Sequence, residues 1–184
     1  VLAHCHTSPS VKNALAAGVR SIEHGSILDE ETAKGIVEHG AFMVPTLLVM
    51  DVLAKSAEAG DIPHYAQMKL RQVHTQMPVS VDLAAQAGVA LGSGTDILGA
   101  RQSGRGAELS LKARVIGPMN AILSATSTNA RLFRMEDRIG RVEEGMEADL
   151  IGIAGDPLGD INVLADDGNV RLVVKGGQVV KETI

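Results

Sequence analysis

The sequence predicts an α/β fold that contains half of a (β/α)8 barrel and ends in a small β-rich segment. Four short β-like runs are each followed by a helical pattern: VLAHCH (1–6), RSIEHG (20–25), AFMVPT (41–46) and VALGSGTD (89–96). Strands that alternate with helices of this length indicate βαβ crossovers and a parallel sheet. From about residue 136 the pattern changes to short β-like runs joined by Gly and Asp turns.

The first two helices have recognisable ends. Ser8 is a candidate N-cap with Pro9 at the first helical position, and Gly18 follows as a stop signal. In the second unit Asp29 is placed to cap a helix that ends at Gly40. These signals predict helices close behind the first and second strands.

The third strand is followed by a longer excursion. We expect a loop or lid near residues 47–62 and then a helical stretch over residues 63–88. Proline removes a helical hydrogen bond and clashes with the preceding turn, so Pro78 is expected to split that stretch into two helices. The fourth strand is expected to end at Asp96.

The remainder of the chain divides into helices and a β-rich tail. Helical patterns follow a Gly-rich loop after Asp96, and VRLVVKGGQVV predicts two strands around a turn at Gly176 and Gly177. We therefore predict a barrel half over residues 1–135 and part of a small β-sandwich over residues 136–184. The chain opens inside a strand without an initiating Met, and a whole barrel takes about 250 residues, so we expect the missing strands upstream.

Composition excludes several classes of function. The 184 residues carry a formal net charge of −5, which argues against nucleic acid or an anionic membrane as a partner. The apolar run AFMVPTLLVM is about half as long as a membrane-spanning helix. The lone Cys5 excludes an internal disulfide and favours a reducing compartment, so a cytoplasmic location is expected.

Metal-ligand residue types follow three of the four predicted strands. His4, His24 and Asp96 stand at the downstream ends of the first, second and fourth runs. Side chains at the carboxyl ends of neighbouring parallel strands converge, and barrel enzymes keep their chemistry there. Imidazole nitrogen and carboxylate oxygen are ligands that zinc accepts. Taken singly, each residue has an ordinary alternative, a hydrogen-bonded structural His or a capping Asp.

The motifs AHCH, GVRSIEHGSILDEE, GAFMVPTL, AGVALGSGTD and IGRVEEGMEADLIGIAGDPL together resemble the metal-dependent amidohydrolase superfamily. The resemblance covers nearly the whole chain and is greatest to the imidazolonepropionase-like and Xaa-Pro-dipeptidase-like branch. It implies that these residues form strands 5–8 of a TIM-like barrel plus part of the β-sandwich. It also implies metal ligands at His4, His24 and Asp96, and two divalent ions, Zn²⁺ by expectation, in a complete site. The family's H-x-H pair and carboxylated lysine have no counterpart in this chain.

The resemblance further implies a mechanism, hydrolysis by a metal-bound hydroxide with Asp96 taking the water's proton and passing it to the leaving nitrogen. It places a substrate-contacting residue at His6, for which metal ligation and a structural role are the alternatives. The superfamily's mononuclear deaminases carry a Glu where this chain has Thr7, so deamination is disfavoured. Arg101 or Arg105, in the loop after Asp96, could grip a substrate carboxylate, or could be solvated surface residues.

These observations predict an amidohydrolase that cleaves the amide C–N bond of a dipeptide or N-acyl amino acid. One alternative is a cyclic-amide hydrolase of the imidazolonepropionase type. Another is a truncated fragment without catalytic activity that only associates with other molecules. The expected partners are a small-molecule or dipeptide substrate and, in addition, a second copy of the chain in a homo-oligomer.

Overall fold

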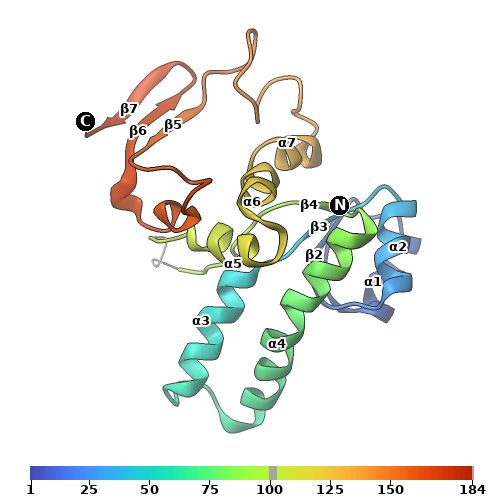
Figure 1. Ribbon diagram of the computed structural model, residues 1–184. Helices are drawn as coiled ribbons and strands as arrows, with labels where there is room; N and C mark the ends of the chain where they lie inside the picture. Colours follow the sequence, from blue (N-terminus) through green and yellow to red (C-terminus); the bar gives the residue numbers. More distant parts are fainter. Residues whose placement is uncertain (100–102, 184) are drawn as a thin grey trace. The chain divides into compact units, whose positions relative to one another are not determined.

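The computed structural model describes residues 1–99 and 103–183, which fall into two compact units, residues 1–98 and 99–184. The first unit contains a four-stranded parallel sheet in chain order (Figure 1). Its strands are β1 (Leu2–Thr7), β2 (Ser21–Ile27), β3 (Phe42–Val44) and β4 (Ala90–Leu91). The parallel α/β architecture predicted from the strand–helix alternation is confirmed in this unit.

Within the first unit, β1 and β2 are each followed by one helix and β3 by two. The helices are α1 (Ser8–Ala16), α2 (Glu30–Glu38), α3 (Leu47–Glu58) and α4 (His64–Ala87). Helix α1 is capped by Thr7, one residue before the predicted cap. The side chain of Asp29 caps α2 as predicted, because it accepts the backbone N–H of Thr32 at 2.7 Å. Helix α1 packs on β1 and β2, and α4 packs along β2.

The region after β3 differs from the prediction in two ways. Residues 47–58 form helix α3 instead of a loop or lid, and this helix buries one apolar face through Leu47, Leu48 and Met50. Helix α4 also runs through Pro78 without dividing. A proline inside a helix costs about 3 kcal/mol. Side chains on either side of it, Met77 and Val81, are 1% and 0% exposed, and each such burial stabilises by about 1.5–3 kcal/mol. Packing therefore outweighs the broken hydrogen bond.

The second unit combines helices with a three-stranded antiparallel sheet. Its elements are α5 (Ala107–Ile116), α6 (Pro118–Ala125), α7 (Ser127–Phe133), β5 (Leu150–Ile153), the 3₁₀ turns η1 (Ile161–Leu164) and η2 (Asp167–Asn169), β6 (Val170–Lys175) and β7 (Gln178–Glu182). Gly176 and Gly177 join β6 to β7 with φ of 55° and 77°. Two positive φ angles are what a two-residue type I′ hairpin requires, so the predicted turn is confirmed.

The assignment of residues 1–135 to a barrel and 136–184 to a sandwich stays a prediction. The division between the two compact units falls earlier in the chain, between residues 98 and 99. Across residues 1–99 and 103–183, none of the helices is both long and apolar enough to cross a membrane.

Candidate metal centre

Three histidines from the first two strands form one cluster. His4 and His6 lie on β1, and His24 lies on the adjacent strand β2, where it pairs with Cys5. Because side chains alternate along a strand, His4 and His6 share one face of β1. One ring nitrogen from each of the three histidines lies within 4.8 Å of the others. The structure thus brings the predicted residues His4 and His24 together and adds His6 to them.

The three rings are held by short contacts. The Nδ1 atom of His4 lies 2.8 Å from Nε2 of His24. On its other side, His24 contacts Oγ1 of Thr46 through Nδ1 at 2.7 Å. Nδ1 of His6 lies 2.9 Å from Oγ of Ser26. The rings of His6 and His24 are stacked, with an interplanar angle of 13° and centroids 4.8 Å apart.

The backbone at the cluster departs from ordinary strand geometry. His24 has φ of 75° and Gly25 has φ of 57°, so two consecutive residues lie in the left-handed region. For a residue other than glycine such a conformation costs on the order of 1–3 kcal/mol and is common at functional sites. Gly25 is required here for a second reason, because a Cβ atom would lie 2.9 Å from Cε of the buried Met43.

Replacing Gly25 by Ala is expected to destabilise the chain more than the same change at Gly40. Both glycines have nearly equal positive φ, 57° and 60°, but a Cβ at Gly40 would meet nothing within 4 Å. The two variants share the left-handed penalty, and only Gly25→Ala adds overpacking against Met43, worth about 1 kcal/mol or more. Urea unfolding of both variants measures the difference. Equal losses of unfolding free energy would show that Met43 does not constrain the β2 end.

Burial favours the neutral form of two of the clustered imidazoles, His24 and His6, because it lowers the pKa of each. His24 is only 5% exposed, and its burial, with smaller contributions from the neighbouring His4 and His6, lowers its pKa to about 4. The negative charge of Asp96 acts in the opposite direction. The pKa of His6 is also lowered, chiefly by burial and then by the charges of His4 and Lys69. A neutral imidazole offers a lone pair, which is the form that binds a metal.

This pKa shift makes stability depend on pH. Between pH 6.5 and 4 the unfolded chain protonates His24 while the folded chain does not, so stability falls as the pH falls through that window. The expected contribution is roughly 3 kcal/mol. Urea unfolding of the metal-free chain at pH 7 and 4.5 measures the loss of unfolding free energy between the two pH values. This loss should be smaller in His24→Asn than in the wild-type chain, and Asn is chosen because it tolerates positive φ. An identical loss in both proteins would contradict a buried neutral His24.

Asp96 is not one of the three residues whose ligand atoms lie within 4.8 Å of one another, but its charge acts on one of them. β4 ends at Leu91, earlier than predicted, and Asp96 follows in an irregular segment, where it is itself exposed and has φ of 53°. Its negative charge nevertheless acts on His24, where it partly offsets the lowering of the pKa by burial. The same charge contributes to the raised pKa of Glu23, of which burial is the larger cause. Metal ligation by His4, His24 and Asp96 together stays a prediction.

The two arginines proposed for substrate binding differ in what the structure describes. Arg101 lies outside the described residues. Arg105 is an exposed residue of the second unit, and its charge helps to lower the pKa of Asp167. The larger causes of that shift are hydrogen bonds to the Asp167 carboxylate from Oγ of Ser103 and N–H of Gly104. A substrate-binding role for either arginine stays a prediction.

Sequence reasoning missed the hydroxyl residues that contact the imidazoles. Ser26 is fully buried two residues after His24, and Thr46 follows β3 at 4% exposure. The signal available in the sequence was their position, since both are polar residues at the downstream ends of predicted strands. Ser26 is itself held by helix α4, because Oγ of Ser80 donates to its carbonyl oxygen at 2.8 Å.

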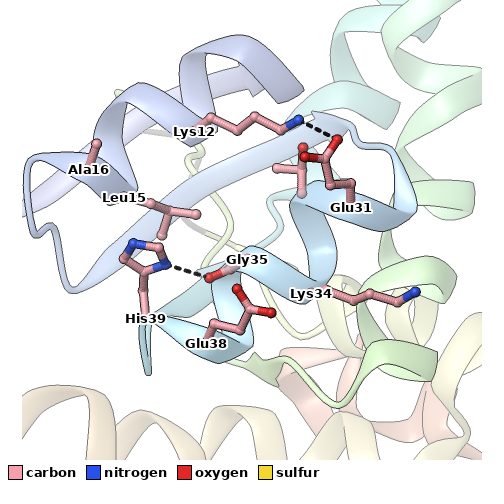
Figure 2. Close-up of a pocket in the computed structure, with 9 residues that line it drawn as sticks. Lys12, Leu15, Ala16, Glu31, Lys34, Gly35, Glu38 and His39 are labelled. Carbon is pink, nitrogen blue, oxygen red and sulfur yellow. Dashed lines mark hydrogen bonds and ion pairs between the residues drawn. The ribbon is translucent and has the colours of Figure 1, made fainter.

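A separate groove of about 410 Å³ lies between helices α1 and α2 (Figure 2). An ion pair of 2.8 Å between Lys12 and Glu31 spans it, and His39 donates to the carbonyl oxygen of Gly35. Its lining residues are Lys12, Leu15, Ala16, Glu31, Thr32, Lys34, Gly35, Glu38 and His39. None of the predicted site residues lines it, so the groove is not the candidate site.

The residues of the cluster fit a divalent cation. Nδ1 of His4 and Nε2 of His24 face each other at 2.8 Å, so a single hydrogen must lie between two nitrogens that can both act as ligands. Burial keeps His24 neutral, and the carboxylate of Asp96 adds negative charge nearby. Imidazole nitrogens with a carboxylate form a donor set typical of zinc.

Comparisons with known proteins agree with this chemistry. A family model described as the amidohydrolase family matches residues 1–180. Ochratoxinase from Aspergillus niger is 31% identical over 183 residues, which cover 98% of this chain and 38% of that protein. A solved prolidase complexed with N-methylphosphonate-L-proline is 38% identical with a TM-score of 0.93, covering 100% of this chain and 45% of that one. A Xaa-Pro dipeptidase with methionine bound in its active site is 34% identical with a TM-score of 0.90, covering 98% and 44%. The chain spans less than half the length of each of these relatives.

Proposed function

Because this chain belongs to the amidohydrolase family, we propose that the whole protein is a metal-dependent hydrolase that cleaves an amide C–N bond. The proposed substrates are dipeptides and N-acyl amino acids with a free carboxylate. Two similar structures support this choice, since one is a prolidase complexed with N-methylphosphonate-L-proline and the other is a Xaa-Pro dipeptidase with methionine bound in its active site. In this proposal the chain supplies strands 5–8 of the barrel and part of the β-sandwich.

The observation that carries the proposal is the convergence of His4, His6 and His24 on neighbouring parallel strands. His4 and His24 would hold a divalent cation, Zn²⁺ by preference, with Asp96 as a third ligand, and a complete site would hold two ions. Such a cation activates water as a nucleophile and polarises the scissile carbonyl.

The other steps belong to side chains of this chain. The carboxylate of Asp96 accepts a proton from the attacking water and delivers it to the leaving nitrogen, as a general base and then a general acid. Its exposure and its irregular segment leave it accessible to substrate. The imidazole of His6, half-buried beside His24, donates a hydrogen bond to the substrate. Arg101 or Arg105 binds the substrate carboxylate through its guanidinium group.

The proposal is tested by assaying the whole protein, with and without a chelator, on three substrate types. These are Xaa-Pro dipeptides, N-acyl amino acids and a cyclic amide. We expect chelator-sensitive release of the amino acid from one of the first two. Turnover of the cyclic amide alone would replace the proposal with the imidazolonepropionase-type activity, and no turnover of any amide by the metal-loaded whole protein would favour a protein without catalytic activity.

Replacing Arg105 by Ala is expected to raise KM for a carboxylate-bearing substrate with little change in kcat. A hydrogen bond to a charged group contributes about 1.5–3 kcal/mol, so the expected rise is roughly 10–100-fold. The same measurement on Arg101→Ala shows which arginine binds the carboxylate. A substrate whose carboxylate is replaced by an amide serves as the control and should be insensitive to either change. Unchanged KM in both variants would remove the carboxylate clamp from the proposal.

A further inference from the structure

Thr46 occupies a position that fixes its side chain beside the histidine cluster. It lies between β3 and α3, as the N-cap residue of that helix, so regular structure holds its backbone on both sides. Its side chain is buried, at 4% exposure, and its Oγ1 atom lies 2.7 Å from Nδ1 of His24. Both partners of this contact are thus removed from bulk water.

The two nitrogens of His24 have different neighbours. Nδ1 faces the hydroxyl of Thr46, and Nε2 faces Nδ1 of His4 at 2.8 Å. A neutral imidazole carries one hydrogen, on either nitrogen. The Thr46 hydroxyl can accept from Nδ1–H or donate to Nδ1, so the direction of this hydrogen bond decides whether Nε2 presents a lone pair or a hydrogen to the cluster.

We propose that Thr46 is a positioning residue whose Oγ1 accepts the Nδ1–H of His24, which leaves the Nε2 lone pair directed at the cluster. Histidines that bind metals generally donate their other ring N–H to a fixed acceptor, which sets both the tautomer and the ring orientation. The backbone of His24, with φ of 75°, is in an uncommon conformation, so a second anchor on the ring restricts its alternatives. The inference rests on the proposed function in taking Nε2 as the ligand atom.

Side-chain ¹⁵N NMR of the metal-free chain at pH 7 tests the tautomer directly. We expect His24 to carry its hydrogen on Nδ1 in the wild-type chain. Thr46→Val keeps the shape of the side chain without the hydroxyl and should move the hydrogen to Nε2. It should also weaken Zn²⁺ binding, measured by competition with a chromophoric chelator, by about 10–100-fold. Thr46→Ser restores the hydroxyl and should restore both properties.

The matched control is Thr128→Val, which removes another buried threonine hydroxyl, from the second unit, where it accepts from Arg131. It should leave the His24 tautomer and the Zn²⁺ affinity unchanged. A hydrogen on Nε2 in the wild-type chain would overturn the proposal even if no variant folded. So would Thr46→Val with wild-type tautomer or wild-type affinity. Because neither readout involves turnover, a whole protein without amidase activity would refute the proposed function and leave this inference to be judged on its own.

Discussion

The whole protein with Asp96→Asn is expected to lose turnover, with kcat reduced by about 10²–10⁴-fold, while its fold is retained. A positioned general acid–base contributes a rate factor of that size, and an amide cannot accept the proton that the carboxylate accepts. Asp96 is exposed and lies outside helix and strand, so the change should leave the unfolding free energy within about 0.5 kcal/mol. Steady-state kinetics and urea unfolding on the same preparation separate the two effects.

An exposed aspartate elsewhere in the first unit, Asp61, provides the matched control. Asp61→Asn removes the same charge and should leave kcat unchanged. Near-normal turnover in Asp96→Asn would refute the role given to this carboxylate. A loss in both variants would assign the effect to net charge and not to proton transfer.

The second large effect concerns an ion pair buried in the second unit. Lys112 and Glu108 stand one turn apart on α5, are 0% and 1% exposed, and approach to 3.9 Å between Nζ and Oε1. Nζ of Lys112 also donates to Oγ of Ser124 at 3.2 Å. Burial lowers the pKa of Lys112 to about 8, and the charge of Glu108 opposes that shift. Lys112→Met is expected to destabilise the chain by about 3–5 kcal/mol, because it removes one member of a buried ion pair.

The double variant Glu108→Leu/Lys112→Met distinguishes this cause from simple loss of packing. Removing both charges also removes the cost of burying the second ion, so the double variant should be more stable than either single variant. Urea unfolding of the three proteins gives the coupling free energy. Strictly additive losses would show that the two side chains do not act as a pair.

Local signals predicted the elements whose structure depends on a few adjacent residues. The type I′ hairpin at Gly176 and Gly177 needs two residues that accept positive φ, and this pair supplies them. The cap at Asp29 likewise depends on one short side chain. Helix α4 could not be predicted in the same way, because its continuity through Pro78 depends on burial against β2, which local propensity does not contain.

The same distinction between local signals and distant contacts applies to the candidate site. Strand order was enough to predict that His4 and His24 lie close together, because they are on adjacent parallel strands. Regular side-chain alternation would turn His24 to the face of Cys5, its register partner, so the contact with His4 also depends on the positive φ of His24, which the sequence did not predict. The distance of Asp96 from them depends on an irregular segment of which the sequence says little. The contact of Thr46 with His24 joins residues 22 positions apart in the chain, and no sequence motif predicts it.

X-ray absorption spectroscopy of the Zn²⁺-loaded chain tests the central claim most directly, that His4 and His24 bind one divalent cation. We expect imidazole ligands at about 2.0–2.1 Å. The imidazole contribution should fall in His4→Ala and in His24→Ala and stay unchanged in His39→Ala, whose ring contacts the Gly35 carbonyl in the α1–α2 groove. A spectrum without imidazole, or one that neither of the first two changes alters, would contradict the account.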